Sequence, residues 1–401
     1  MTEHAASING DRIADTLVIV LPVGDTLAIR DANGTLDRDW SAYEHLGPRF
    51  GRVLLVTQGG ADERAIANRL PVVPEVVCND MGLTTSDFFA DATERISGLL
   101  VRDSTAIVKA ERIVGCRLAE PIARRLLEIG VDTRVIARAG HVWSRRIARE
   151  EGADSEGALR AGDDERRLCA IADRVVSPSA RILDDLTWRF AIEPGRAVTL
   201  PECIRMGAPV PPEERDNSRI AAYGPLVPSS GFHFLVEAVA GIGELTDTAP
   251  ELELIGDGPQ EAELRAAAEL AEIKLTVTPT GTYDEAAERL ATAAVLVTTP
   301  STFRDPRNVL EAMVRHTPCL AVGDQTADGL IEHGVTGLRC AEEPRAIAQA
   351  LFGLLSDQAW AEQMATTAGE RVAGACGPQR AAEAEARILI EAFAAARRLA
   401  A

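Results

Sequence analysis

The chain has 401 residues, which is too long for one ordinary hydrophobic core and predicts two domains of roughly 200 residues each. Hydrophobic residues make up 46% of it and charged residues 26%, which excludes a disordered or fibrous protein. The formal net charge of −19 would repel a phosphate backbone, so we exclude nucleic acid as a partner.

The seven cysteines are odd in number, far apart in sequence and without a histidine at metal-ligand spacing. They predict reduced thiols, and we expect no metal site. The first residues, MTEHAASINGDR, lack the basic start and apolar stretch of a signal peptide, and no apolar run reaches the ~18 residues of a membrane span. We therefore expect a cytoplasmic protein.

In the first half of the chain, short β-branched runs alternate with stretches of helical period, which is the pattern of parallel strands joined by helices. The predicted strands are Thr16–Leu21, Val53–Thr57, Leu99–Val101, Ala106–Val108, Arg134–Ala137 and Asp173–Ser177. The predicted helices are Trp40–Phe50, Pro121–Ile129 and Ser155–Ile171.

The predicted helix Pro121–Ile129 carries Arg124 and Arg125, which are suited to peripheral contact with an anionic membrane. The net charge of the chain instead favours a solvent-exposed helix, so membrane contact stays an open alternative.

A segment rich in Pro, Gly and charge, 201–217, interrupts the pattern and predicts a linker. The pattern then restarts with the predicted strands Arg219–Tyr223, Glu251–Ile255, Leu275–Thr278, Val295–Thr298 and Cys319–Val322. An Ala-rich amphipathic helix, Gln379–Leu399, ends the chain. We predict two Rossmann-like, doubly wound parallel-sheet domains, 1–200 and 218–375, facing a cleft, with the C-terminal segment 376–401 packing back on the first.

The first candidate site is LELIGDGP, Leu252–Pro259, an apolar strand that runs into a glycine turn and then a helix. Gly256 and Gly258 would let a ligand approach the backbone, and the helix after Pro259 offers free N–H groups to an anion. A simple tight turn is an equally good interpretation of this motif.

Two further motifs follow, VLVTTPSTFRDPRNVLEAM from Val295 to Met313 and GLIEHGVTGL from Gly329 to Leu338. In this order and spacing, the three motifs resemble the retaining glycosyltransferases of family four, the group 1 glycosyl transferases, which have the GT-B fold. The resemblance covers most of 170–360 and little of the first 150 residues. It implies that the second domain binds a nucleotide diphosphate sugar, linked to UDP or GDP, and that no separate cofactor is needed.

Within the resemblance, Glu311 matches the family glutamate that accepts hydrogen bonds from the ribose hydroxyls of the donor, as an ionised carboxylate does well. The free backbone N–H groups of Asn308, Val309 and Leu310, at the start of the same helix, would then face the diphosphate. An ordinary exposed helix glutamate is the alternative interpretation of Glu311.

The donor motif also departs from the family. The first family glutamate falls at Phe303 or Arg304, neither of which is acidic, and the loop after Gly224 lacks the usual arginine and lysine. Arg304 and Arg307 lie in the loop that should face the phosphate, and a guanidinium binds phosphate oxygens in a bidentate way. They are our candidates to replace the missing cations, the alternative being solvated charges paired with Asp305.

In the first domain, the resemblance points to His141 and Arg138, which follow a predicted strand where such transferases present side chains to the sugar and the acceptor. Gly24 and Asp25, after the first strand, occupy the place of the acceptor loop. His316 stands where the family tends to have glycine.

These observations predict a glycosyltransferase that moves a sugar, with retention of anomeric configuration, from a nucleotide diphosphate to an unknown acceptor, whether glycan, lipid or small molecule. The missing cations leave open a GT-B protein that has lost transfer activity and serves as a binding or scaffolding partner of an active transferase. A sugar epimerase or phosphorylase on the same fold is a third alternative.

Overall fold

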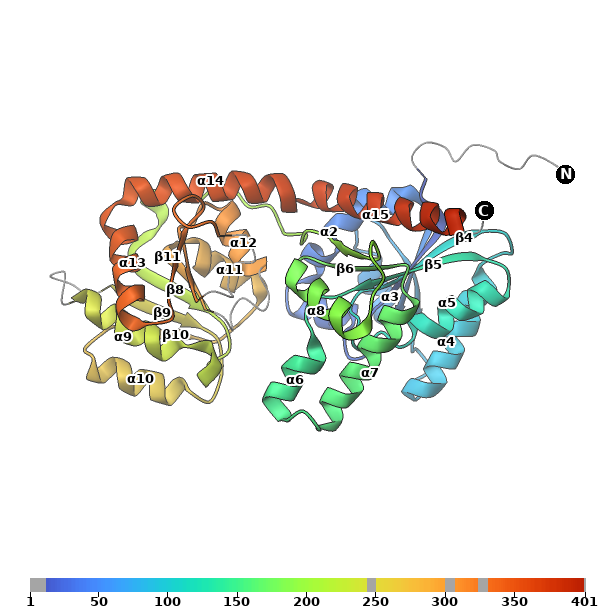
Figure 1. The fold of residues 1–401 in the computed structure, drawn as a ribbon, viewed down its shortest axis with the longest axis horizontal. Coiled ribbons are helices and arrows are strands. Elements are labelled where there is room, and N and C mark those ends of the chain that lie inside the picture. The colour runs from blue at the N-terminus through green and yellow to red at the C-terminus, as the bar shows by residue number, and fades with distance from the viewer. Residues whose placement is uncertain (1–11, 244–249, 300–306, 324–330, 400–401) are drawn as a thin grey trace. The chain divides into compact units, whose positions relative to one another are not determined.

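A computed structural model describes residues 12–243, 250–299, 307–323 and 331–399 (Figure 1). The chain divides into two compact units, each described by itself below. The first unit comprises Met1–Cys203 and Pro378–Ala401, and the second comprises Ile204–Gly377. Residues 204–217, which we predicted to be part of a linker, therefore belong to the second unit, and the C-terminal helix belongs to the first.

The described part of the first unit contains a parallel sheet in the order β3-β2-β1-β4-β5-β6-β7 (Figure 1). Its strands are β1 (Ala14–Val20), β2 (Phe50–Thr57), β3 (Glu75–Cys78), β4 (Thr105–Ala110), β5 (Asp132–Arg138), β6 (Arg174–Ser177) and β7 (Ala197–Thr199). Its helices are α1 (Leu27–Ala32), α2 (Leu36–Leu46), α3 (Glu63–Ala67), α4 (Thr85–Leu99), α5 (Ala119–Glu128), α6 (Trp143–Glu151), α7 (Glu156–Ile171), α8 (Ala180–Phe190) and α15 (Pro378–Leu399), with a 3-10 turn η1 (Gly47–Arg49).

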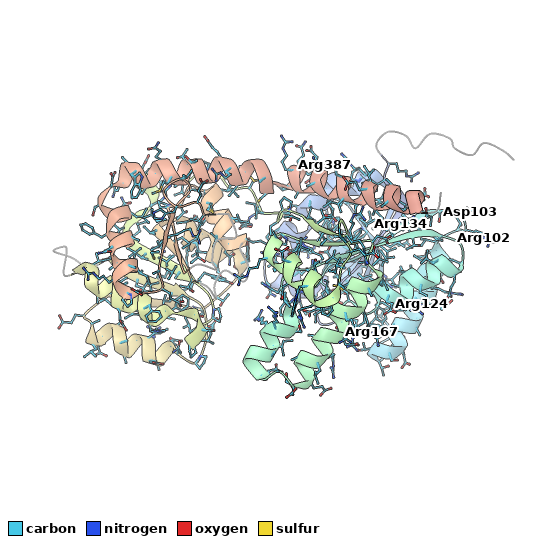
Figure 2. All side chains as sticks on the ribbon, in the orientation of Figure 1. Arg102, Asp103, Arg124, Arg134, Arg167 and Arg387 are labelled. Carbon is cyan, nitrogen blue, oxygen red and sulfur yellow. The ribbon has the colours of Figure 1, made fainter. Side chains whose placement is uncertain are left out.

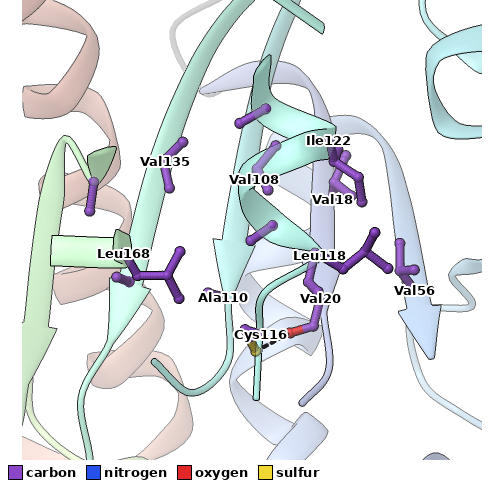
Figure 3. Close-up of a cluster of buried hydrophobic side chains, with 14 of the residues drawn as sticks. Val18, Val20, Val56, Val108, Ala110, Cys116, Leu118, Ile122, Val135 and Leu168 are labelled. Atoms are coloured by element: carbon purple, nitrogen blue, oxygen red, sulfur yellow. Dashed lines mark hydrogen bonds between the residues drawn. The ribbon is translucent and has the colours of Figure 1, made fainter. Parts of the chain in front are cut away.

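Alternate residues of each strand enter two different cores, because successive side chains of a strand point to opposite faces. Val18 and Val20 of β1 pack with α4, α5, α7 and α8 on one face, where Figure 3 shows Val18 beside Ile122 of α5 and Val20 beside Cys116. Leu17 and Ile19 pack with α1, α2, α3 and α15 on the other face. The sheet is thus buried on both sides, as its continuous apolar strands require.

The helix α15 completes the second of these cores although it comes from the other end of the chain. It lies against α2, and its buried Ala386, Leu389 and Phe393 pack into the same apolar cluster as Trp40 (Figure 1). The guanidinium of Arg134, on β5, stacks over the Phe393 ring at 4.9 Å, a cation–π contact. The first unit therefore uses α15 to close this core.

The described part of the second unit also contains a parallel sheet, with its strands in the order β10-β9-β8-β11-β12-β13. Its strands are β8 (Asp216–Tyr223), β9 (Glu251–Ile255), β10 (Leu275–Thr278), β11 (Ala293–Thr298), β12 (Cys319–Val322) and β13 (Leu338–Cys340). Its helices are α9 (Phe232–Gly243), α10 (Glu261–Leu270), α11 (Tyr283–Ala291), α12 (Arg307–Val314), α13 (Pro344–Ser356) and α14 (Gln358–Cys376), with 3-10 turns η2 (Pro212–Glu214) and η3 (Pro228–Ser230).

Side chains at the helix ends fix several of these boundaries. The hydroxyl of Thr282 accepts the amide of Glu285, and the Glu285 carboxylate accepts the amide of Thr282, which forms a capping box at the start of α11. His316 follows α12 with φ of +63°, a left-handed conformation that glycine adopts without strain. This conformation explains physically why a glycine suits that position.

Most predicted strands exist, but Leu99–Val101 was wrong. Leu99 is the last residue of α4 and Val101 lies in the exposed turn before β4. The apolar run that predicted a strand is the C-terminus of α4 followed by one exposed valine, Val101. Three short strands, β3, β7 and β13, were not predicted. Runs of three or four residues carry little periodicity, although β6, β10 and β12 were predicted at the same length of four.

Candidate functional site

Each sheet has one point where the connections change direction, and open parallel sheets bind ligands beside such a point, at the carboxyl ends of the strands. In the first unit this point lies between β1 and β4, and in the second it lies between β8 and β11. Most of the predicted site residues follow one of these strands. The predicted donor residues belong to the second unit and the predicted acceptor residues to the first.

The helix α12 follows β11 and carries the predicted donor residues Asn308, Val309, Leu310 and Glu311, all of which are buried. The side chains of Val309 and Leu310 pack into the apolar core, so only their backbone amides remain for a ligand. The first four N–H groups of a helix have no partner within it and carry the positive end of its dipole. This arrangement suits an anion beyond the carboxyl end of β11.

Asn308 differs from its neighbours because its buried Oδ1 accepts no hydrogen bond from the described residues. It lines a small cavity with Tyr223 and Thr298, the last residues of β8 and β11. A buried acceptor without a partner costs free energy, about 1–3 kcal/mol, which a ligand that donates to it would recover. The cavity therefore marks a polar position between the two strand ends.

The Glu311 carboxylate is 4% exposed, and its Oε1 accepts the backbone N–H of Arg205 at 3.2 Å. Arg205 also pairs through Nη1 with Asp284, in the first turn of α11, at 2.7 Å. The residue therefore ties α11 to α12 beside the candidate site. The sequence had placed Arg205 in the linker, and no motif marked it.

Gly256 and Gly258 follow β9, and the structure gives both a packing role. A Cβ on Gly256 would lie 1.9 Å from the carbonyl oxygen of Gly224, and one on Gly258 would lie 2.4 Å from that of Leu226. The amide of Leu226 donates to the oxygen of Asp257 at 2.9 Å, which joins the loops after β8 and β9. The glycines thus allow two backbones of the protein to meet.

An internal hydrogen bond joins the two ends of the loop after β8, the loop in which the family has an arginine and a lysine. The hydroxyl of Ser230 donates to the carbonyl of Pro225, and Ser230 is buried. Arg307, the first residue of α12, is half-buried, whereas Phe303, Arg304 and Asp305 lie outside the described residues.

In the first unit, the loop after β1 contains Gly24, with φ of +80°, and Asp25. The Asp25 carboxylate accepts two hydrogen bonds of 2.9 Å from Arg30 on α1 and lies 3.6 Å from Arg112, which follows β4. The Asp25 carboxylate thus pairs with two arginines, Arg30 and Arg112, at the switch point. The sequence predicted its position but not these partners.

Arg138 is the last residue of β5, and His141 lies in the loop that follows it. Arg138 donates to Glu202 at 2.6 Å. The His141 ring meets the edge of Trp143 at 5.4 Å, and the guanidinium groups of Arg112 and Arg146 lie over that indole at 5.4 and 4.9 Å. His141 therefore belongs to an aromatic and cationic cluster at the carboxyl ends of β4 and β5.

A buried charge network behind this cluster escaped the sequence analysis. Lys109 of β4 lies 3.1 Å from Glu111 and 2.6 Å from Glu385 of α15, and it donates to the hydroxyl of Tyr43 at 2.8 Å. Tyr43 in turn donates to Glu111. A lysine in an apolar strand was the available signal, because a buried ammonium requires carboxylate partners.

The network shifts the pKa of both of its central groups. Burial alone would lower the pKa of Lys109, but the charges of Glu111 and Glu385 outweigh burial and raise it. Burial would likewise raise the pKa of Glu111, yet Lys109, Arg138 and Arg30 hold it below the ordinary 4.5. Both groups are therefore charged at neutral pH.

Among the described residues, no three His, Cys, Asp or Glu side chains are grouped so that they could hold a metal ion. None of the described helices is both long and apolar enough to cross a membrane.

Residues 217–357 match the family model of the group 1 glycosyl transferases. A search of curated protein sequences found no match to the chain. Among solved structures, HepE of Anabaena in complex with UDP-glucose is 15% identical, with a TM-score of 0.66 over 95% of this chain and 99% of that one. Sucrose-phosphate synthase of Thermosynechococcus elongatus is 17% identical, with a TM-score of 0.63 over 95% and 100%.

At these identities the similarity to solved structures shows the fold, while the family model concerns the second unit. The predicted pair of parallel-sheet domains is confirmed. Residues 217–357, in the second unit, thus match the predicted group 1 glycosyl transferases, and the chain has the GT-B fold.

Proposed function

We propose that the protein is a glycosyltransferase that takes a sugar from a nucleotide diphosphate bound at the carboxyl ends of β8 and β11 and transfers it with retention of configuration. The proposal rests on the groups that come together at the start of α12. Its amides, the buried Asn308 and the buried Glu311 lie together where this fold binds nucleotides. UDP is the first donor base to test, because HepE was solved with UDP-glucose.

The roles within this site follow from chemistry. The α12 amides and Arg307, with Arg304, would bind the diphosphate and stabilise the charge that develops on it as the bond to the sugar breaks. Glu311 would accept hydrogen bonds from the ribose. In the first unit, Gly24, Asp25, Arg138 and His141 would face the acceptor, with His141 beside the transferred sugar. A transfer without a metal ion requires such cations and amides to stabilise the negative charge on the leaving diphosphate.

Calorimetric titration with UDP, GDP, ADP and free uridine tests the proposal directly. We expect one diphosphate to bind, and Glu311→Ala and Glu311→Gln to weaken it about tenfold or more, since the lost bonds are made by a charged group. Replacing Glu269 of α10, an exposed glutamate, by alanine should leave the affinity unchanged. The double variant Arg304→Ser/Arg307→Ser should weaken the diphosphate but not uridine.

The outcomes separate the alternatives. Absence of binding to every diphosphate by the unmodified protein would overturn the donor site. Diphosphate binding without transfer from any sugar nucleotide would instead favour the binding or scaffolding partner. A product whose anomeric proton shows inversion by NMR would overturn retention alone.

A further inference from the structure

The first unit contains a groove of about 1270 Å³ lined by α4, α5, α6 and α7. The groove begins at Val23 and Gly115, in the loops that follow β1 and β4. These two strands flank the switch point of the first sheet, where open parallel sheets bind ligands. Its volume exceeds the ~300–1,000 Å³ of pockets for small ligands, so it has room for a larger molecule.

The end of the groove nearest the sheet is held in place by buried hydrogen bonds. Asp164 of α7, 4% exposed, accepts the amide of Gly115 at 3.1 Å and pairs with Arg117. The carbonyl of Gly115 accepts the amide of Val23 at 2.9 Å. The wall is thus formed before any ligand arrives, which lowers the cost of binding.

The groove combines this rigid end with apolar side chains that remain accessible. Val23 is 45% exposed, and Phe89 and Ile147 are partly exposed. Burying such surface contributes about 25 cal/mol per Å², so the groove favours a ligand with an apolar part.

Arginine side chains are concentrated along the groove. Five arginines and three acidic residues line it, and each of the five arginines pairs with at least one carboxylate. Arg124 of α5 and Arg167 of α7 both approach the single carboxylate of Glu120, at 2.9 and 3.9 Å (Figure 2). Arg167 also pairs with Asp163 at 2.9 Å.

These ion pairs leave binding capacity on both arginines. The side chains of Arg124 and Arg167 are 69% and 60% exposed, and exposed pairs contribute little, about 0–1 kcal/mol. A guanidinium has five N–H donors, and the contacts with Glu120 and Asp163 leave some of them on each side chain for a further acceptor. A phosphate can therefore accept hydrogen bonds from both arginines at small cost.

We propose that this groove binds an amphiphilic phosphate, an apolar chain or ring that carries a phosphate ester, and that this molecule is the acceptor of the transfer. The apolar residues would hold its hydrocarbon part, while Arg124 and Arg167 bind its phosphate. The role as acceptor rests on the proposed function, whereas the binding itself does not.

Calorimetric titration of the full chain with n-decyl phosphate, kept below its micelle concentration, tests the proposal. We expect binding that the double variant Arg124→Ser/Arg167→Ser weakens about tenfold or more, because charge-assisted bonds are lost. The control Arg102→Ser/Arg387→Ser removes two exposed arginines of the same unit outside the groove and should stay within about twofold. Phe89→Ser should weaken decyl phosphate too, through the apolar part alone.

Two further probes identify what is recognised. Decyl maltoside and inorganic phosphate should each bind about tenfold more weakly than decyl phosphate, since each lacks one of the two contacts. Equal binding of either probe, equal losses in both double variants, or no binding of decyl phosphate would overturn the proposal. Parallel titrations with UDP keep the two proposals apart, because failure there would remove the donor site and leave the groove as a binding site.

Discussion

At the residue scale, Lys109 shows how one side chain holds several elements together. Lys109 lies on β4, and its ammonium contacts Glu111 just beyond the end of that strand. The same ammonium binds Tyr43 of α2 and Glu385 of α15, so it links β4 to both helices. Removing one partner of a buried ion pair costs about 3–5 kcal/mol, because an uncompensated charge is left behind. The other lysine of the chain, Lys274, pairs with Glu251 at 2.6 Å but is 75% exposed.

We expect Lys109→Met to reduce the free energy of unfolding by several kcal/mol at pH 7, measured by urea denaturation with α-helical circular dichroism. Lys274→Met is the matched control and should change it little, because that pair is screened by solvent. Equal effects of the two substitutions would contradict a buried role for Lys109.

The same variant has a defined pH dependence. In the unmodified protein the pKa of Glu111 is below its ordinary 4.5, so its stabilisation is present above pH 4.5 and is lost as pH falls further. The pKa of Lys109 is above its ordinary 10.5, so its contribution is complete at all lower pH values. Without the lysine, Glu111 loses the positive charge that lowers its pKa most and should take up a proton more readily. The destabilisation by Lys109→Met should therefore be smaller at pH 4 than at pH 7.

At the element scale, α15 is the helix whose packing matters most to the first unit. Leu389 is fully buried in the cluster that contains Trp40, whereas its neighbour Ile390 is 50% exposed. The two residues have similar volume and are adjacent in the middle of the helix, so the main difference between them is burial.

We expect Leu389→Ala to lower the free energy of unfolding of the first unit by about 2–5 kcal/mol, since it removes a buried side chain and leaves a cavity. Ile390→Ala should cost far less and serves as the control. Trp40 packs in the same cluster, and its fluorescence reports the transition during urea unfolding in a background where the other three tryptophans are replaced by phenylalanine. Comparable losses in both variants would argue that α15 is not packed against the sheet.

At the scale of the whole molecule, the two units have separate cores, and a ligand should stabilise only the unit that binds it. Scanning calorimetry with UDP at about 100 times its dissociation constant should stabilise the second unit by about 2.7 kcal/mol through mass action. The transition that Leu389→Ala lowers should stay in place. A shift of that transition by UDP would place nucleotide binding in the first unit, contrary to the proposed site.

The sequence by itself determined the architecture and the family. Strand and helix periodicity is a local property, so two α/β domains, most of their strands and the family motifs could be read from it. It also singled out Asn308 and Glu311 as candidates for the donor site, because they lie in a continuous motif. It did not reveal that Gly256 and Gly258 meet the backbone at Gly224 and Leu226, although it marked them as glycines.

Only the tertiary structure decided which distant residues act together. Lys109 and Glu385 are 276 positions apart, and Arg124 and Arg167 lie on different helices, so no local pattern joins either pair. Their contacts exist because parallel strands bring successive loops to one edge of a sheet and because α15 returns to the unit where the chain begins. Periodicity fixes elements, whereas charge networks and grooves arise from the packing between them.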